Sequence, residues 1–237
     1  MFQNKSLQPS LRQSDPFSLS QEIAALRSQL LSGLSVLGLD LASEKIDLIL
    51  GYVGLLHKWG AVYNLTAIKA PEDILIQHVL DCLSIVNPLL SRVTGLSSVL
   101  DVGAGAGLPS VMIAIACPQV KVVAIDAVAK KIAFINQVAL QLGLQNLSAQ
   151  HQRIESVLSA QYDVVISRAF ASLKDFIEGT RGAIRIGGVW LAMKGRIPSG
   201  EIESLPAGFM VTDILPLKVP GLNAERCLVC IAKASGS

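Results

Sequence analysis

The sequence has few charged and few aromatic residues, which limits the classes of protein that fit it. Charged residues make up 16% of the 237 positions and aromatic residues 5%, whereas hydrophobic residues make up 51%. This composition is typical of a globular protein and excludes a disordered chain. The formal net charge is only +2, so the protein does not coat nucleic acid through bulk charge, although a local basic patch remains compatible with it.

The sequence also lacks an apolar run that reads as a membrane span, despite a mean hydropathy of +0.52. The uncharged run Val102–Val120 contains Gly103, Gly105, Gly107, Pro109 and Pro118. A span needs about 20 helix-compatible apolar residues, so this run indicates a strand, a loop and a helix instead. The first twenty residues contain no apolar signal core. We therefore expect a cytoplasmic protein with no membrane association.

Cysteine and histidine are too sparse to predict a metal site. Cys227 and Cys230 have C-x-x-C spacing, but they lie in a predicted strand, where residues three apart point to opposite faces. Without a second pair, buried strand cysteines are a better interpretation than zinc or redox chemistry. His57, His78 and His151 show no metal-ligand spacing, so we expect no metal.

Apolar periodicity predicts helices in the first part of the chain and alternating strands and helices in the rest. One helix carries an apolar stripe from Ile46 to Leu56 behind a predicted Ser43 cap, and another runs from Pro71 to Asn87-Pro88. The later predicted helices are Leu108–Cys117, Lys130–Leu142 and Leu173–Ile186, the last ending at Gly187-Gly188. The predicted strands are Ser98–Val102, Val120–Ile125, Ser148–His151, Tyr162–Ser167, Val189–Met193, Phe209–Val219 and Arg226–Ala232.

This alternation predicts an α/β fold with a doubly wound, seven-stranded, mostly parallel sheet. The last two strands have no helix between them, so we expect one antiparallel strand. The expected organisation is a flexible tail at 1–17, an N-terminal helical extension at 18–95 and an α/β domain at 96–237.

A glycine loop, Asp101–Gly107, follows the first strand and opens a helix. In an open α/β sheet this is the carboxyl edge, where ligands bind. A dinucleotide fingerprint would place a third glycine at Leu108, but it occurs one residue early at Gly107. The spacing therefore favours a ligand lying across the loop, such as the methionine half of S-adenosylmethionine. Asp126 ends the second strand, where a carboxylate can accept both ribose hydroxyls; a cap for the next helix is the alternative.

Several further segments make the chain resemble the bacterial small-subunit ribosomal RNA methyltransferase G family, also called glucose-inhibited division protein B. The matching stretches are His57–Thr66 (HKWGAVYNLT), Asp101–Pro109 (DVGAGAGLP), Asp126 with Lys130-Lys131, Val165–Phe170 (VISRAF), Met193–Gly195, Val219–Leu222 and Glu225-Arg226. The resemblance implies a class I (Rossmann-like) methyltransferase whose domain at 96–237 binds S-adenosylmethionine. It also implies methyl transfer to N7 of a guanine in 16S rRNA of the small ribosomal subunit.

The resemblance implies roles for individual residues. Gly103, with Gly105, Gly107 and Leu108, would line the cofactor site, Ile154 and Glu155 would flank the adenine, and Arg168 would face both cofactor and substrate. Arg168 and Asn64 are the candidate catalytic residues. The chain departs from the family pattern at Cys227, where histidine is common, at Asn223-Ala224 in place of Asp-Gly, and at Ala104 and Ala106 in the loop. These departures weaken the match to the family at the turn before the last predicted strand. They leave the fold and cofactor predictions unchanged.

The residue chemistry is compatible with attack by a ring nitrogen. Guanine N7 has an in-plane lone pair, so no general base is required. Methyltransferases that act on exocyclic amines often carry [DN]PP[YF] after the fourth strand, whereas this chain has Ser167-Arg168-Ala169-Phe170 there. The Arg168 guanidinium can reach O6, a phosphate or the cofactor carboxylate, with a structural ion pair as the alternative. Phe170 can stack on a flipped base or belong to the core.

Other features are consistent with RNA without specifying it. Trp59 and Tyr63, near the end of a helix, are read as core anchors. Nine basic residues face four acidic ones between Lys130 and Arg196, which fits an RNA surface or a solvated one; the basic ones are Lys130, Lys131, Arg153, Arg168, Lys174, Arg181, Arg185, Lys194 and Arg196. The alternatives are a methyltransferase acting on another RNA or a small molecule, an NAD-dependent oxidoreductase and a non-catalytic RNA-binding module. Nothing in the sequence demands an oligomer, so we expect a monomer.

Overall fold

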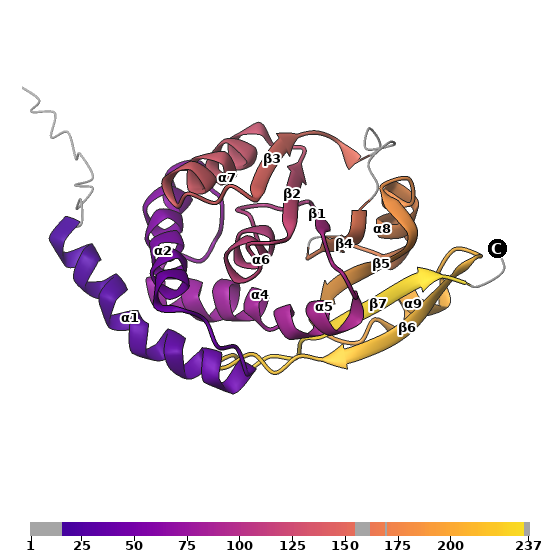
Figure 1. The fold of residues 1–237 in the computed structure, drawn as a ribbon, viewed down its shortest axis with the longest axis horizontal. Helices are drawn as coiled ribbons and strands as arrows, with labels where there is room; N and C mark the ends of the chain where they lie inside the picture. The colour runs from indigo at the N-terminus through magenta and orange to yellow at the C-terminus, as the bar shows by residue number, and fades with distance from the viewer. Residues whose placement is uncertain (1–15, 155–161, 169, 235–237) are drawn as a thin grey trace, which may run out of the picture.

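The computed structural model describes residues 16–154, 162–168 and 170–234 (Figure 1). The tail expected at 1–17 lies outside these residues except for Pro16 and Phe17, which already belong to a helix. The helices are α1 (Pro16–Leu37), α2 (Ser43–Tyr63), α3 (Pro71–Ile74), η1 (Leu75–Leu80), α4 (Asp81–Leu83), α5 (Val86–Arg92), α6 (Ser110–Ala116), α7 (Ala129–Gln141), α8 (Leu173–Thr180) and α9 (Ser199–Glu203). The strands are β1 (Ser98–Val102), β2 (Lys121–Asp126), β3 (Leu147–His151), β4 (Tyr162–Ser167), β5 (Ile184–Lys194), β6 (Phe209–Pro216) and β7 (Cys227–Lys233).

Within the described residues, the strands form one seven-stranded sheet in the order β3-β2-β1-β4-β5-β7-β6. The strands from β1 to β5 run parallel, and β7 is antiparallel to both β5 and β6. The sequence-based prediction of a mostly parallel sheet with one antiparallel strand is therefore confirmed. Because β7 inserts between β5 and β6, the loop that joins β6 to β7 returns to the carboxyl end of β5 (Figure 1).

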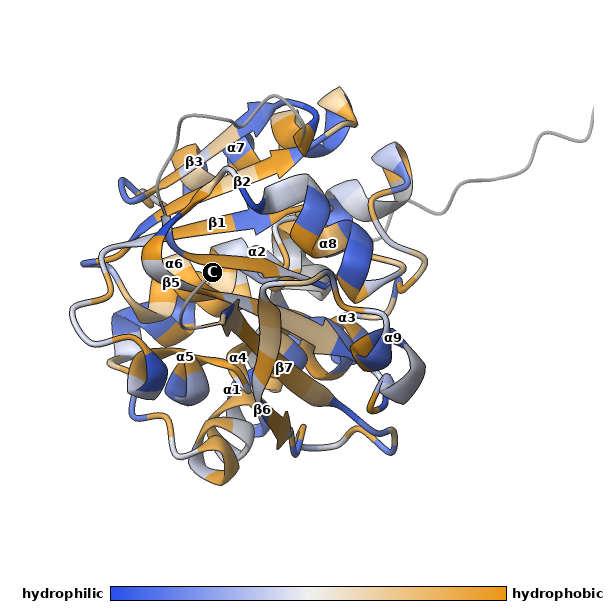
Figure 2. Ribbon diagram, turned by 90° about the vertical axis from the view of Figure 1, so that its right-hand side faces the viewer, coloured by the Kyte–Doolittle hydropathy of each residue, from blue (hydrophilic) through white to orange (hydrophobic). Residues whose placement is uncertain are grey.

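Helices cover both faces of the sheet because its buried strands alternate their side chains between two cores. Val99 and Val122 pack with α6, α7 and the N-terminal helices, whereas Leu100 and Val123 pack with α8. Cys230 belongs to the first core and Cys227 to the second. The prediction of buried strand cysteines is confirmed, since both thiols are free and buried. Figure 2 shows the strands as mostly hydrophobic, whereas α8 alternates hydrophobic and hydrophilic residues.

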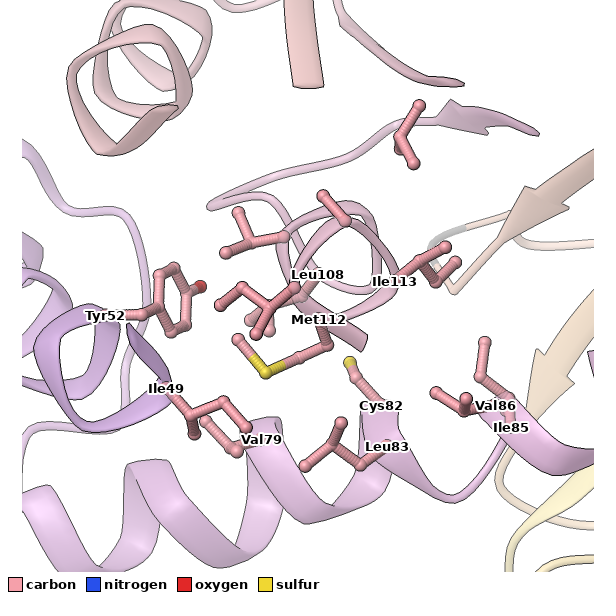
Figure 3. Close-up of a cluster of buried hydrophobic side chains, with 14 of the residues drawn as sticks. Ile49, Tyr52, Val79, Cys82, Leu83, Ile85, Val86, Leu108, Met112 and Ile113 are labelled. Carbon is pink, nitrogen blue, oxygen red and sulfur yellow. The ribbon is translucent and has the colours of Figure 1, made fainter. Parts of the chain in front are cut away.

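The N-terminal helices share the first core and do not form a separate one. Figure 3 shows Ile49 and Tyr52 of α2, Val79 of η1 and Cys82 of α4 directed toward Met112 of α6. The Tyr52 hydroxyl donates to the backbone oxygen of Ala106 at 3.0 Å, which ties α2 to the glycine loop. This layer is therefore packed directly on the part of the sheet that carries the loop.

The helical stretch Pro71–Arg92 is long and apolar enough to cross a membrane by length and composition, but 61% of its most apolar window is buried inside the fold. It is a core element, interrupted by a π-helical turn in η1 and by a break at Ser84 and Ile85. Asn87-Pro88 was predicted to end this helix, and that prediction is wrong. A new helix, α5, starts at Val86, and proline is tolerated in its first turn because the N–H groups there have no intrahelical partner.

Two further predictions of element boundaries are wrong. Ser43 does not cap α2: it is the first helical residue, and its hydroxyl accepts from Arg27. The helix expected to run to Ile186 ends at Thr180, and Gly187-Gly188 lies inside β5. A register shift against β4 accommodates the glycines, with Gly187 at φ 76°. Glycine inside a strand often marks a bulge or a close backbone approach, and the helical reading overlooked this.

Gly188 is required because a β carbon there would lie 2.9 Å from the Asp163 carbonyl oxygen and 2.7 Å from Ile184 Cγ1. We expect Gly188→Ala to lower the free energy of unfolding by about 1–3 kcal/mol, measured by urea denaturation. Gly200→Ala is the control, because a β carbon there meets nothing within 4 Å. That variant should stay within about 1 kcal/mol of the parent, and equal stability of both variants would contradict the bulge argument.

Candidate functional site

The glycine loop turns sharply away from β1 against the end of β2. Gly103, Gly105 and Gly107 have φ values of 68°, 60° and 88°, which residues with a β carbon rarely adopt. The backbone N–H groups of Gly103 and Ala104 donate to the Ile125 carbonyl oxygen at 2.9 and 3.1 Å. The loop is thus fixed at the carboxyl edge of the parallel strands, where the sequence placed it.

Gly105 and Gly107 serve different purposes. A β carbon at Gly107 would lie 2.6 Å from Val111 Cγ2 and 3.3 Å from Ile135 Cγ1, so this glycine permits close helix packing. A β carbon at Gly105 would meet nothing within 4 Å. The loop at Gly105 is therefore open, which suits the approach of a ligand to the backbone.

Asp126 makes protein contacts at both carboxylate oxygens, and its ribose-binding role stays a prediction. Its Oδ1 accepts from the Val128 N–H at 2.8 Å, which organises the turn into α7, and its Oδ2 accepts from the Gly105 N–H at 3.0 Å. Lys131 Nζ lies 3.5 Å from the same Oδ2. A carboxylate has about four lone-pair sites, so these contacts leave acceptor capacity for a ligand.

A cleft of about 500 Å³, called here the glycine-loop cleft, opens beside these groups. It has the size of a small-molecule site. Gly103, Asp126, Ile154 and Phe170 are among its lining residues, as are Val102, Ile125, Ala127, Gln152, Arg153, Ala171 and Asp175. Gly105, Gly107 and Leu108 are not among the described residues that line it, and the Leu108 side chain is buried in the first core (Figure 3). Glu155 lies outside the described residues.

Asp101, the first residue of the loop, is fully buried beneath it. Its Oδ2 accepts from the Ser110 N–H at 3.0 Å, while Oδ1 has no hydrogen-bond partner among the described residues. Burial raises the pKa of this carboxyl to about 6. Asp101 therefore holds the N-terminus of α6 against the loop, at the cost of one unsatisfied oxygen.

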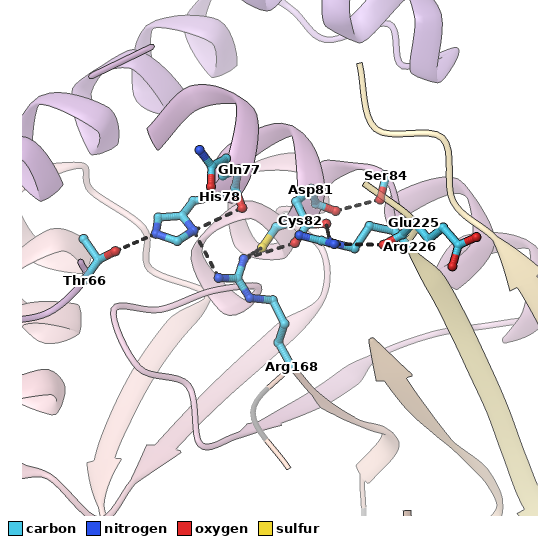
Figure 4. Close-up of polar contacts among 9 residues, drawn as sticks. All are labelled: Thr66, Gln77, His78, Asp81, Cys82, Ser84, Arg168, Glu225 and Arg226. Carbon is cyan, nitrogen blue, oxygen red and sulfur yellow. Dashed lines mark hydrogen bonds and ion pairs between the residues drawn. The ribbon is translucent and has the colours of Figure 1, made fainter. Parts of the chain in front are cut away.

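Arg168 does not extend into open solvent from the end of β4 but reaches the N-terminal helices (Figure 4). Its Nη1 lies 3.1 Å from Asp81 Oδ2, and Arg226 Nε lies 3.0 Å from the other Asp81 oxygen. Asp81 is only 2% exposed, so one buried carboxylate pairs with two arginines from distant segments. The structural ion pair given as the alternative role of Arg168 is thus present.

His78 completes this cluster from the adjacent π-helical turn. Arg168 Nη2 lies 3.0 Å from His78 Nδ1, and Thr66 Oγ1 lies 2.7 Å from Nε2. Burial and then the nearby Arg168 charge lower the His78 pKa to about 4. The ring is therefore neutral near pH 7, with Nδ1 accepting from the guanidinium and Nε2–H donating to Thr66.

These five residues, Thr66, His78, Asp81, Arg168 and Arg226, are called here the Asp81 network. Thr66, Arg168 and Arg226 come from three separate stretches that carry the family resemblance. Sequence reasoning missed His78 and Asp81 as site residues; the available signal was a histidine and an aspartate three residues apart in a largely apolar helical stretch. Their segment contains a π-helical turn, which frequently occurs at functional sites.

Asn64 ends α2 in a left-handed conformation, with φ 51° and ψ 49°, and is exposed. It lies two residues before Thr66, so it borders the Asp81 network in sequence, and its role at the reaction centre stays a prediction. Upstream, Trp59 stacks on Tyr63 with ring centroids 5.7 Å apart. Trp59 packs against the first core, whereas Tyr63 is 42% exposed, so the core-anchor interpretation holds only for Trp59.

A larger cleft of about 970 Å³ lies between residues 195–197 and 216–227, and is called here the 216–227 cleft. It adjoins the carboxyl end of β5, and Arg226 belongs to both this cleft and the Asp81 network. Lys194 Nζ lies 3.2 Å from the Phe170 carbonyl oxygen, which joins the end of β5 to the turn after β4. The two clefts therefore flank the same turn, and Phe170 itself packs on Phe176 with ring centroids 5.2 Å apart.

The basic residues counted in the sequence do not all share one face. Arg181 and Arg185 lie before or at the start of β5, at the amino edge of the sheet, and Arg185 pairs with Asp163. Lys130, Arg153 and Arg196 follow strand ends at the carboxyl edge. A basic surface at this edge is consequently smaller than the sequence count indicates. Among the described residues, no cluster of three His, Cys, Asp or Glu side chains could hold a metal ion.

The lowered pKa of His78 predicts that the stability of the protein depends on pH. Between pH 6.5 and about 4 the unfolded chain binds a proton at His78 that the folded protein does not, so stability falls as the pH falls through this window. His78→Asn keeps an acceptor near Nδ1 but cannot titrate. From pH 7 to 5, we expect the parent to lose about 1–2 kcal/mol more unfolding free energy than the variant, measured by urea denaturation. Parallel losses would contradict this assignment.

Sequence comparison finds that the chain is similar to proteins named ribosomal RNA small subunit methyltransferase G. A sequence model described as rRNA small subunit methyltransferase G (GidB) matches residues 45–229. Proteins named ribosomal RNA small subunit methyltransferase G are 47% identical over 86% of this chain and 93% of their own in Methylibium petroleiphilum, and 46% identical over 93% and 99% in Bordetella avium.

Solved structures agree with the fold. A SAM-dependent methyltransferase from Aquifex aeolicus superposes with a TM-score of 0.52 at 16% identity, over 67% of this chain and 92% of that one. One from Geobacter sulfurreducens, in complex with S-adenosyl-L-homocysteine, gives 0.50 at 13% identity, over 65% and 91%. The fold is therefore that of a class I methyltransferase. From the sequence matches, the chain belongs to the rRNA small subunit methyltransferase G family.

Proposed function

We propose that this protein transfers the methyl group of S-adenosylmethionine to N7 of a guanine in 16S rRNA of the small ribosomal subunit. The observation that carries the proposal is the position of the glycine loop and Asp126 at a carboxyl-edge cleft, in a chain of the rRNA small subunit methyltransferase G family. We further propose that it acts as a cytoplasmic monomer and that residues 18–95 form a helical extension of the methyltransferase domain.

The glycine-loop cleft fits the nucleoside part of the methyl donor. Asp126 has acceptor capacity for ribose hydroxyls, Ile154 provides an apolar surface for adenine, and the backbone at Gly103 lines the same cleft. The Geobacter sulfurreducens relative in fold was solved with the demethylated product, S-adenosyl-L-homocysteine. Gly107 and Leu108 would act indirectly, since their contacts are with the core beneath the loop.

When bound, the sulfonium supplies an activated methyl group. The lone pair of guanine N7 forms the new N–C bond while the C–S bond breaks and its electron pair stays on sulfur. No proton leaves N7, so the protein's task is to align the two reactants. The described part of the turn after β4 offers Arg168 and Phe170 for this task, and neither of these is a carboxylate base.

Arg168 suits orientation better than proton transfer. A guanidinium directed at N7 would oppose the positive charge that forms there, so we propose that it contacts O6, a phosphate or the donor carboxylate. Its bonds to Asp81 and His78 hold its plane in one orientation. Asn64 is proposed to approach the same reaction centre from the end of α2.

Methylation of purified 16S rRNA and of small subunits with radiolabelled S-adenosylmethionine tests the proposal. We expect label in RNA and 7-methylguanosine as the labelled nucleoside after digestion. Label in a different nucleoside would overturn the guanine-N7 assignment, and absence of label from both substrates would overturn the rRNA assignment. Calorimetry with NAD tests the alternative that the protein is an NAD-dependent oxidoreductase, because such an enzyme would bind NAD.

Asp126→Asn tests the donor site. The variant keeps the side-chain shape but replaces one acceptor oxygen by a donor, so we expect at least a tenfold weaker affinity for S-adenosylmethionine by calorimetry. Asp213→Asn is the control, because Asp213 is also a strand aspartate paired with a basic residue, Arg92, but lies on β6. Equal affinities in the two variants would remove Asp126 from the donor site.

A further inference from the structure

Asp81 links two arginines that come from the surroundings of the two clefts, although Asp81 lines neither cleft and Arg168 is not among the described residues that line the glycine-loop cleft. Its Oδ2 accepts from Arg168, which directly follows β4 beside the glycine-loop cleft, and its Oδ1 accepts from Arg226, which lines the 216–227 cleft. We infer that Asp81 is a positioning residue that holds Arg168 toward the methyl donor and Arg226 toward the RNA. This inference rests on the proposed function.

The geometry favours orientation over stability as the purpose of this carboxylate. Asp81 is 2% exposed and accepts one bond from each arginine, rather than a two-bond fork from one of them. A buried ion pair of this kind is often no more stabilising than apolar residues of the same volume. What the arrangement does supply is two guanidinium groups at fixed positions relative to each other.

Arg168 is held on more than one side. Nη1 donates to Asp81 and lies 3.6 Å from Cys82 Sγ, while Nη2 donates to neutral His78. These partners lie on η1 and α4, and Thr66 in turn fixes the His78 ring. Figure 4 shows the guanidinium enclosed by these side chains, with the Arg168 stem rising from the β4 turn. The N-terminal layer thus determines where Arg168 points.

Arg226 is held on one side by the same carboxylate. It lies just before β7, at the end of the loop that forms the 216–227 cleft, and its Nη1 donates to the Glu225 carbonyl oxygen at 2.8 Å. Arg196 and Lys218 also line this cleft, against a single acidic lining residue, Glu225. An excess of basic groups is the chemistry that binds RNA phosphates, so this cleft is where the substrate strand would lie.

Asp81→Asn separates the two arginines without changing the side-chain shape. An amide can accept from one guanidinium, but its NH₂ group then faces the other one, which loses its acceptor. Arg226→Gln removes a charge only from the 216–227 cleft, where RNA is proposed to bind, and leaves the Asp81–Arg168 pair in place. Asp47→Asn is a matched control, because Asp47 pairs with Arg27 on the same helical layer, far along the chain from either cleft.

Equilibrium binding of S-adenosylmethionine by calorimetry and of 16S rRNA by filter binding tests the inference. We expect Asp81→Asn to weaken both affinities about tenfold, Arg226→Gln to weaken only RNA binding about tenfold, and Asp47→Asn to change neither. The double variant Asp81→Asn with Arg226→Gln should bind RNA no more weakly than either single variant, because both changes remove one interaction.

Wild-type affinities for both ligands in a folded Asp81→Asn variant would overturn the inference, as would additive losses in the double variant. Thermal melting establishes that each variant is folded. Should Asp81→Asn fail to fold, Arg226→Gln decides alone, since unchanged RNA binding there overturns the assignment. Failure of the unmodified protein to bind either ligand contradicts the proposed function instead, so the two failures are distinguishable.

Discussion

The ion pairing of Asp81 is the interaction on which the arrangement of the site depends. Burial raises the pKa of this carboxyl, which is 2% exposed, while the two guanidinium groups that reach it favour its ionised form. Those groups arrive from the end of β4 and from the loop before β7, while the carboxylate comes from the N-terminal layer. Three parts of the chain therefore have to be in place together, which fixes the Arg168 guanidinium relative to that of Arg226.

The need to hold Asp81 against Arg168 also explains why the N-terminal helices share their core with the sheet. Tyr52 hydrogen-bonds to the glycine loop at Ala106, and Cys82 packs near Met112 of α6 (Figure 3). A separate helical domain joined by a linker could not hold a buried carboxylate against Arg168. The layer thus does more than cover the sheet, because it sets the orientation of a side chain at the carboxyl edge.

Sequence reasoning recovered the parts of this structure that depend on local pattern. The glycine loop, the strand end at Asp126 and the one antiparallel strand expected among the last two follow from short-range signals, and the structure has each of them. Two failures have long-range causes. Gly187-Gly188 look like a helix stop until β4 is known to lie beside them, and neither His78 nor Asp81 shows in sequence which distant arginine it meets.

The insertion of β7 between β5 and β6 has a consequence for synthesis of the chain. β6 is made before β7 but has no hydrogen-bonding partner in the sheet other than β7, among the described strands. The strands β1 to β5, which carry the glycine loop, can pair as they emerge from the ribosome. The strand order therefore predicts that the nascent protein forms its glycine-loop cleft first and completes the 216–227 cleft only when β7 has been added.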